Sequence, residues 1–176
     1  MTTWVALLRG INLGRARRVA MADLRALLEG LGYGEVRTLL QSGNAVFTGT
    51  GPAGKLETSI EREIEKELGL RVTVMVRSAA QLRKIVAANP FAGQTTDPKQ
   101  LHVVFLSAPP SAASLDALDP DEYAPDEYAV GDRVIYLRLP NGVAGSRFPW
   151  DRSLNVDTTM RNWNTTTKLA ELAAAT

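Results

Sequence analysis

Apolar positions recur at two spacings along the first 77 residues, and together they predict the order β-α-β-β-α-β. Residues 72–77 alternate Val72, Val74 and Val76 with more polar neighbours, as a half-buried strand does. Residues 56–68 instead repeat isoleucine and leucine on one helical stripe. The predicted elements are, in order, Val5–Arg9, Ala22–Leu31, Val36–Leu40, Ala45–Thr48, Leu56–Leu68 and Val72–Arg77. This order is typical of the ferredoxin-like fold.

The second half of the chain has a less regular pattern. Ser78-x-x-Gln81 is a capping-box signal for a helix that runs to about Ala88, and Asn89-Pro90 ends it. The remaining predicted elements are a strand at Leu101–Leu106, a hairpin of Glu127–Val130 with Val134–Leu139, and a closing helix at Asn164–Ala175. We therefore expect an α+β protein in which a ferredoxin-like subdomain at residues 1–77 packs with a smaller α+β subdomain of about three strands at residues 78–176.

The composition excludes several kinds of chemistry. The 176 residues include no cysteine, which removes disulfides, thiolate nucleophiles, iron–sulfur clusters and zinc-finger ligation. His102 is the single histidine, so no cluster of histidines can hold a metal within one chain. We expect no metal and no cofactor. No catalytic motif is recognisable, and the sequence leaves open whether the protein is an enzyme.

Charge is distributed unevenly, although the formal net charge is only +1. Residues 110–132 hold seven acidic side chains and no lysine or arginine, among three prolines. This composition predicts a solvated acidic connector that a partner protein could recognise. The first residues lack the basic region and long apolar stretch of a signal peptide, and no apolar run has the length of a membrane span. We expect a cytoplasmic protein with no membrane association.

Two motif-like segments fall short of the motifs they resemble. Residues 49–55 match G-x-x-x-x-G-K, but Leu56 stands where a phosphate-binding loop needs serine or threonine for Mg²⁺. The first and third strands also lie where an RNA-recognition motif places its stacking segments. Trp4 and Phe47 are the candidate stacking platforms, and the alternative is that both pack under the second half of the chain.

Strand polarity brings two polar loops to one end of the first sheet. In the ferredoxin-like order, the end of the first strand and the turn between the second and third strands lie at the same end. Polar, glycine-rich loops that meet at a sheet end can form a ligand site. The candidate ligand-binding residues are Arg9, Gly10, Asn12, Gln41, Ser42, Gly43 and Asn44. The alternative is that these residues serve turn geometry and local backbone hydrogen bonds.

A second polar cluster lies at the start of the closing helix. Its candidate ligand-binding residues are Arg161, Asn162, Trp163 and Asn164. Arginine binds anions, helix N-termini attract them, and tryptophan beside arginine offers stacking. The alternative is a capped helix whose tryptophan fills the seam between the two halves. We hypothesise that this cluster joins the first two loops in one site, in which case substitutions of Arg9 and Arg161 should be energetically coupled.

Several segments together resemble one bacterial family. They are Leu8-Arg9-Gly10-Ile11-Asn12-Leu13-Gly14, Met21-x-x-Leu24-Arg25, Leu40-Gln41-Ser42-Gly43-Asn44-Ala45-Val46-Phe47, Asn89-Pro90-Phe91 and Thr159-x-Arg161-Asn162-Trp163-Asn164-Thr165. Their order and spacing resemble an uncharacterised family known as domain of unknown function 1697 (DUF1697), from Trp4 to Leu172. The resemblance implies an α+β protein with a ferredoxin-like subdomain and implies no activity. The chain departs from the family pattern at Met160 and in Arg15-Ala16-Arg17-Arg18.

Three functions remain open from the sequence. The favoured one is binding of a small anionic ligand, phosphorylated or nucleotide-like, since two arginines and many neutral donors suit binding better than acid–base chemistry. The second is a nucleic-acid binding module that uses residues 15–18 and exposed aromatic side chains, and it would weaken steeply with salt. The third is an interaction protein recognised through its acidic segment. The sequence does not determine the oligomeric state.

Overall fold

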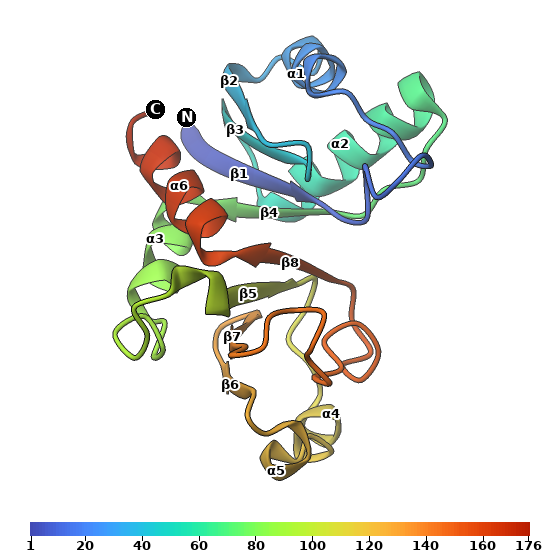
Figure 1. Cartoon of the computed structure of the whole chain (residues 1–176). Coiled ribbons are helices and arrows are strands. Elements are labelled where there is room, and N and C mark those ends of the chain that lie inside the picture. Colours follow the sequence, from blue (N-terminus) through green and yellow to red (C-terminus); the bar gives the residue numbers. More distant parts are fainter. The chain divides into compact units, whose positions relative to one another are not determined.

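The computed structural model describes all residues from 1 to 176 and has a mixed α+β architecture. It contains two four-stranded antiparallel sheets and six α-helices (Figure 1). Contacts divide the chain into two compact units: unit 1 is residues 1–83 with 168–176, and unit 2 is residues 84–167. The subdomain boundary that the sequence predicts between residues 77 and 78 stays a prediction. No helix of the chain combines the length and apolar character needed to cross a bilayer.

Unit 1 contains the six elements that the sequence predicts in its first 77 residues. They are β1 (Thr2–Leu8), α1 (Met21–Gly30), β2 (Gly34–Leu39), β3 (Asn44–Gly49), α2 (Ala53–Leu68) and β4 (Val74–Ser78). The sheet order is β2-β3-β1-β4, and every neighbouring pair is antiparallel. α3 (Ala79–Ala87) follows β4 directly. Ser78 and Gln81 form the predicted capping box, in which each side chain accepts a hydrogen bond from the other's backbone N–H.

Both candidate stacking residues lie in the core of unit 1. Trp4 and Phe47 are buried, in one hydrophobic cluster with Leu28 of α1 and Ile60 of α2. The Trp4 indole N–H donates to the Gly49 carbonyl at 3.3 Å. The idea that these rings form a nucleic-acid platform is therefore wrong. They pack against the helices of their own unit because the alternate residues of β1 and β3 point to the same face of the sheet as α1 and α2.

Two glutamates of α2 accept hydrogen bonds from backbone N–H groups at the unpaired edge of β4. The backbone N–H of Val74 donates to the Glu61 carboxylate at 2.9 Å, and that of Val76 donates to the Glu57 carboxylate at 2.8 Å. The two glutamates are four residues apart and so occupy one helix face, while the two valines are two apart and present their N–H groups to one edge. Exposed edges with unpaired N–H groups invite strand addition, and these carboxylates close this one.

Unit 2 has four strands, one more than the sequence predicts. Its elements are β5 (Leu101–Leu106), α4 (Ala112–Asp116), α5 (Pro120–Tyr123), β6 (Glu127–Val130), β7 (Val134–Arg138) and β8 (Thr158–Asn162), with a short 3-10 helix at Pro98–Gln100 before β5. α6 (Trp163–Ala174) follows β8. The extra strand, β8, has the sequence TTMRN, which lacks the alternation of apolar and polar residues that signals a strand. The acidic segment 110–132 is itself folded, since it contains α4, α5 and β6.

The second sheet repeats the plan of the first. Its order, β6-β7-β5-β8, is the order β2-β3-β1-β4 with each strand number raised by four. In both units the backbone N–H that ends the first strand donates to the turn before the third, from Leu8 to Gly43 and from Leu106 to Arg133, at 2.9 Å each. The next N–H donates to the residue before the last strand, from Arg9 to Thr73 and from Ser107 to Asp157, again at 2.9 Å. A helix follows the last strand in both cases. The sequence gives no sign of this repeat, because two sheets can share a hydrogen-bonding plan without sharing side chains.

Candidate functional site

The two polar loops of unit 1 meet at one end of the sheet, as the strand order predicts. The Asn12 side-chain amide joins them: its Nδ2 donates to the Gln41 carbonyl at 2.7 Å and to the Val19 carbonyl at 2.8 Å. Its Oδ1 accepts from the Val19 backbone N–H at 2.9 Å. All hydrogen-bonding atoms of this amide are therefore occupied within the protein. Asn12 positions the loops, and the bond set leaves it no donor for a ligand.

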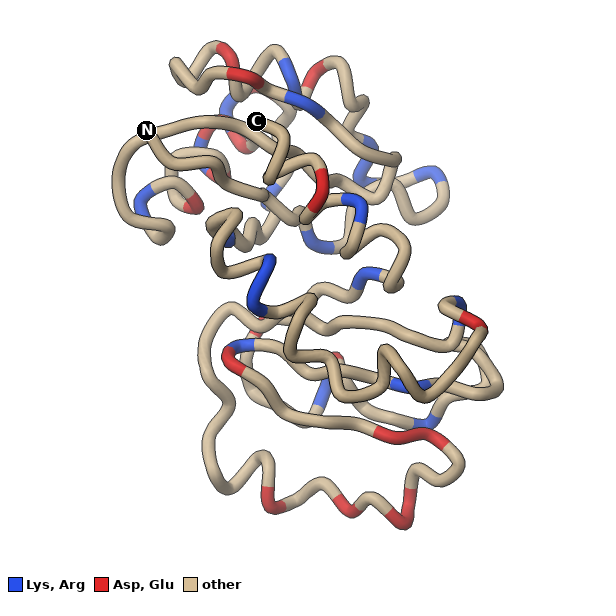
Figure 2. The backbone as a smooth tube through the Cα atoms, turned by 90° about the vertical axis from the view of Figure 1, so that its left-hand side faces the viewer, with Lys and Arg blue, Asp and Glu red and all other residues tan.

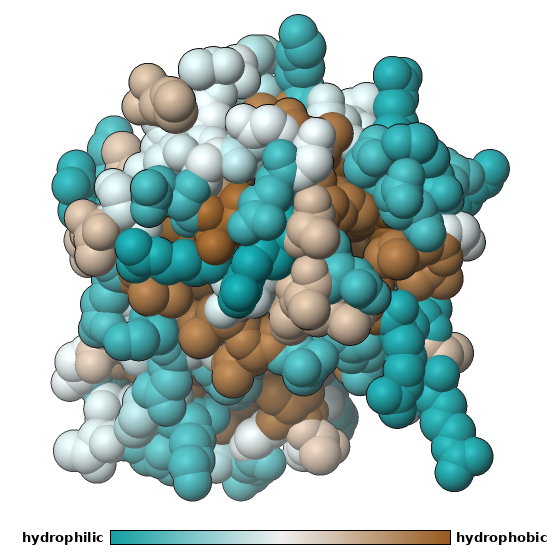
Figure 3. Space-filling view, turned by 90° about the horizontal axis from the view of Figure 1, so that it is seen from above, coloured by the Kyte–Doolittle hydropathy of each residue, from teal (hydrophilic) through white to brown (hydrophobic).

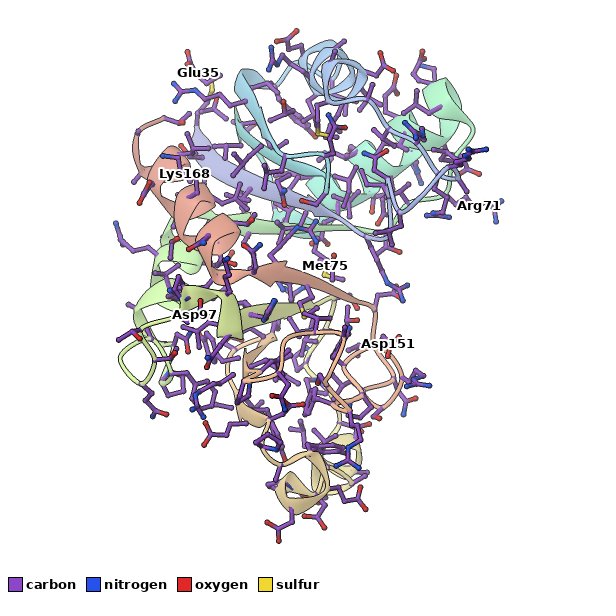
Figure 4. All side chains as sticks on the ribbon, viewed as in Figure 1. Glu35, Arg71, Met75, Asp97, Asp151 and Lys168 are labelled. Atoms are coloured by element: carbon purple, nitrogen blue, oxygen red, sulfur yellow. The ribbon has the colours of Figure 1, made fainter.

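Arg17 holds the same loop from its other side. Its Nε donates to the Gly10 carbonyl at 3.1 Å, and its terminal nitrogen donates to the Arg71 carbonyl at 2.7 Å. Arg71, labelled at the outer end of unit 1 in Figure 4, pairs in turn with Glu65 through solvent-exposed side chains 2.9 Å apart. Sequence reasoning placed Arg17 among the basic residues available to nucleic acid. The structure uses its guanidinium for backbone carbonyls instead.

Several residues of the two loops have a left-handed backbone conformation, which residues other than glycine rarely adopt. Left-handed φ values occur at Gly10 (63°), Asn12 (55°), Gly14 (77°), Arg17 (54°), Leu40 (60°) and Gly43 (85°). Three of the six non-glycine residues with positive φ in the chain are among them. Such residues raise the free energy of the folded state, so favourable contacts around them must offset the strain. They concentrate at functional sites. The hydrogen bonds of Asn12 and Arg17 supply these contacts.

Gly43 and Asn44 are buried parts of the turn. A Cβ on Gly43 would lie 2.6 Å from Ile11 Cδ1 and 2.9 Å from Leu8 Cβ, so no side chain fits there. Asn44 has no exposed surface, and its Nδ2 donates to the Leu39 carbonyl at 2.7 Å and to the Ser42 hydroxyl at 2.9 Å. Both residues shape the turn from beneath. This leaves the partly buried Arg9 and the exposed Gly10, Gln41 and Ser42 as the predicted residues that face solvent.

The second predicted cluster belongs to unit 2 and the start of α6. Arg161 is 6% exposed, and one terminal nitrogen donates to the Thr159 hydroxyl at 2.7 Å and to the Met160 carbonyl at 2.9 Å. Burial lowers the pKa of Arg161 to about 10, and the guanidinium remains charged at neutral pH. Asn162 caps α6, since its Oδ1 accepts from the Thr165 N–H at 2.8 Å. The helix cap in the alternative that the sequence offered is confirmed, and the placement of Trp163 in a seam stays a prediction.

Neighbouring residues of this cluster also support α6. The Thr167 hydroxyl donates to the carbonyls of Trp163 at 3.0 Å and Asn164 at 3.1 Å, so both residues serve as backbone acceptors in the first turn. Arg161 has a counterpart in unit 1: Arg77 is 2% exposed and donates to the Val76 carbonyl at 3.0 Å. The register places both arginines opposite a buried valine of the first strand, Val103 and Val5. A buried arginine before the last helix is thus part of the repeated plan. The single site that combines this cluster with the unit 1 loops stays a prediction.

The repeat shows how unusual the loops of unit 1 are. At the positions of Arg9 and Gly10, unit 2 has Ser107 and Ala108, followed by two prolines. At the position of the buried Asn44, unit 2 has Val134, which is also fully buried. The same backbone plan therefore folds without these polar groups. Their presence in unit 1 is not a requirement of the sheet.

His102 has a structural environment. It is 7% exposed in β5, and its Nδ1 is buried without a hydrogen-bond partner. Burial lowers the pKa of His102 below the ordinary 6.5, against the smaller raising effect of a hydrogen bond with the Gln100 backbone. A neutral imidazole at the start of a core strand fits the structural role that the sequence favours.

Unit 1 also has a hollow away from the loops. A groove of about 420 Å³ lies between α1 and α2, and its lining includes Leu27 and Leu68 with three carboxylates, Asp23, Glu63 and Glu67. Figure 3 views the molecule from above and shows hydrophilic side chains projecting around hydrophobic ones. The acidic lining distinguishes this groove from the arginine-bearing loops.

Comparisons with known proteins agree with the fold. The chain is similar to the structure of a conserved bacterial protein, SP0830 from Streptococcus pneumoniae, with a TM-score of 0.78 and 21% sequence identity over 98% of each chain. At this identity the likeness shows the fold alone. No curated protein matches the chain. The family DUF1697, described as proteins of unknown function, matches residues 1–136, and the chain therefore belongs to that family.

Proposed function

We propose that the loop end of the unit 1 sheet binds a small anionic ligand of the phosphorylated or nucleotide-like class. The observation that carries this proposal is the contrast between two sheets of one plan. Unit 1 has six left-handed residues in its two loops and joins the loops through the Asn12 amide, whereas the corresponding loops of unit 2 have one left-handed residue, Arg133, and the first of them has the sequence Ser-Ala-Pro-Pro. The stability of the sheet does not require these left-handed residues, and a binding role accounts for them.

The groups in the loops suit an anion. Residues 9–19 and 40–44 contain four arginines and no carboxylate or histidine. Within them, Arg15, Arg18, Gln41 and Ser42 are exposed and Arg9 is partly buried. Arginine forms paired hydrogen bonds with phosphate and carboxylate oxygens, and neutral donors complete such sites. We assign ligand contact to Arg9, Gly10, Gln41 and Ser42, and positioning to Asn12, Gly43 and Asn44.

The same groups argue for binding rather than acid–base catalysis. Proton transfer near neutral pH needs a group that titrates there, usually histidine or a carboxyl group. The loops contain neither. Nucleic acid is the weaker candidate, because the aromatic rings it would stack on are buried and Arg17 is engaged with carbonyls.

The proposal includes a more specific fold for the first sheet and its helices. We propose that residues 1–77 form a ferredoxin-like unit, supported by the order β-α-β-β-α-β and by antiparallel pairing in the order β2-β3-β1-β4. In that arrangement the loops after β1 and between β2 and β3 share one sheet end, which is the proposed binding surface.

A thermal-shift screen of the full chain tests the function. The panel contains nucleotides, sugar phosphates, inorganic phosphate and short single-stranded RNA and DNA. A ligand at 100 times its Kd adds about 2.7 kcal/mol, which at this size raises Tm by roughly 5–10 °C. A small anion whose shift disappears in Arg9→Ala and persists in Arg37→Ala supports the proposal, since Arg37 is an exposed arginine of β2 outside the loops. A panel in which no anion shifts Tm, or one whose shift Arg9→Ala leaves unchanged, overturns it. A shift confined to nucleic acid that vanishes with salt would favour the second candidate.

A further inference from the structure

Unit 2 contains a pocket in its acidic segment that the anion proposal does not use. Its volume is about 410 Å³, and its lining is Phe91, Pro120, Ala124, Pro125, Asp126, Glu127 and Tyr128. The lining joins the loop after α3, the helix α5 and the first residues of β6. This volume lies within the range of pockets that hold small ligands.

Asp126 is the unusual residue of this pocket. It is 7% exposed, and its backbone N–H donates to the Tyr123 carbonyl at 2.9 Å. No hydrogen bond or ion pair of the protein reaches its carboxylate, in contrast to Glu127, whose carboxylate lies 2.6 Å from the Arg138 guanidinium. The carboxylate of this largely buried residue therefore meets solvent in place of an opposite charge or a donor from the protein. A positively charged ligand would supply the missing partner.

The aromatic side chains of the pocket are held in place. The Tyr128 hydroxyl donates to the Leu118 carbonyl at 3.2 Å, and its ring packs on Phe148 with centroids 4.9 Å apart. The Phe91 backbone N–H donates to the Asn89 side chain at 3.0 Å, which fixes the Asn89-Pro90-Phe91 turn. Aromatic faces attract ammonium and guanidinium groups, and rigid rings lose little entropy on binding.

The surrounding charge has the matching sign. Residues 110–132 carry seven carboxylates and no basic side chain. Figure 2 shows acidic residues in red along this part of the backbone. Such a field raises the local concentration of cations and steers them toward the pocket.

We propose that this pocket binds an organic cation, an ammonium or guanidinium group on an aliphatic stem, with the charge at the Asp126 carboxylate and the stem between Phe91, Tyr128 and the two prolines. Two sources carry this chemistry, a free amine and a lysine or arginine side chain of another protein. The proposal is independent of the anion site, which lies in the other unit.

NMR titration of the isotope-labelled full chain tests the proposal and separates the two sources. The probes are 1,5-diaminopentane for a free amine, Nα-acetyl-lysine amide for a protein side chain, and Nα-acetyl-norleucine amide as the uncharged match. We expect shifts around residues 118–128 with one or both cationic probes and none with norleucine. A preference for the diamine assigns a free amine, and a preference for the lysine amide assigns a protein side chain. Absence of shifts with both cations, or equal shifts with norleucine, overturns the proposal.

Matched variants decide whether the pocket or the general charge is responsible. Asp126→Asn keeps the shape and should weaken the cationic probe about tenfold. Asp116→Asn removes the same charge from an exposed position of the same segment and should leave the Kd within about twofold. Equal losses in both variants would show attraction by net charge alone and would refute the pocket. If Asp126→Asn does not fold, Phe91→Leu replaces it, with the same expected loss and the same control.

Discussion

The Asn12 side-chain amide donates to the backbone carbonyl of Gln41 at 2.7 Å and thereby connects the loop after β1 to the turn between β2 and β3. Because the acceptor is a backbone atom, the bond depends on the side chain of Asn12 and not on that of Gln41. One residue thus sets the spacing of two loops that are 29 positions apart in the chain.

We expect Asn12→Asp to loosen this sheet end. Aspartate keeps the acceptor for Val19 and tolerates the left-handed backbone, but it loses both amide donors. The free energy of unfolding should fall by about 1–3 kcal/mol, and hydrogen exchange should accelerate in residues 10–19 and 40–44. Gln41→Ala is the matched control and should change stability by less than about 0.5 kcal/mol. Similar losses in both variants would contradict the assigned role.

Gly43→Ala should be strongly destabilising. The new Cβ would meet Ile11 and Leu8 at 2.6 and 2.9 Å, and φ is 85°. Overpacking and left-handed strain together should cost about 2–4 kcal/mol, measured by urea unfolding. Gly10→Ala adds a Cβ with no atom within 4 Å at φ 63°. Backbone strain alone should therefore lower its free energy of unfolding, by about 1 kcal/mol. A Gly43→Ala protein as stable as Gly10→Ala would show that the turn relaxes around the methyl group.

Glu57→Ala should expose the edge of β4. The Val76 N–H loses its acceptor at a buried strand, which should cost about 1–3 kcal/mol in urea unfolding and promote association at high protein concentration. Glu57→Gln retains a side-chain oxygen at the same place and should recover most of the stability. If the two variants behave alike, the carboxylate does not act as the edge acceptor.

His102 should make stability depend on pH below its ordinary pKa. Burial lowers the pKa of His102 in the folded protein below 6.5, so the unfolded chain binds the proton more readily. The stabilising contribution is therefore complete above about pH 6.5 and is lost as the pH falls from there toward the folded-state pKa. Urea midpoints at about pH 7.5 and about pH 5.5 measure this loss. His102→Gln should reduce the difference between the two, and an unchanged difference would exclude the imidazole as its source.

The sequence by itself determined the elements of unit 1 and the meeting of its two loops. Periodicity identifies strands and helices there because each buries one face, and the order of elements then dictates which loops share a sheet end. The same reasoning identifies the capping box at Ser78 and the hairpin of β6 and β7. The sequence also indicates the family, because the segments around Asn12 and Asn44 have the order and spacing of the family's motifs, and the family matches residues 1–136.

Only the tertiary structure decided which polar side chains face solvent. The sequence predicts Asn12 and Asn44 as ligand-binding residues and Arg17 as a nucleic-acid contact, but their side chains donate to backbone carbonyls brought close by folding. A donor's partner depends on atoms distant in sequence, and no local pattern records it.

The structure also decided three features that periodicity does not show. β8 is a strand although TTMRN has no alternation, because pairing with β5 supplies its hydrogen bonds. The two sheets repeat one plan through backbone contacts that leave the side chains unconstrained. The acidic segment lines a pocket in which Asp126 is joined by Phe91, 35 residues earlier in the chain. Local patterns report which faces are apolar, whereas long-range contacts determine which groups are left to bind a ligand.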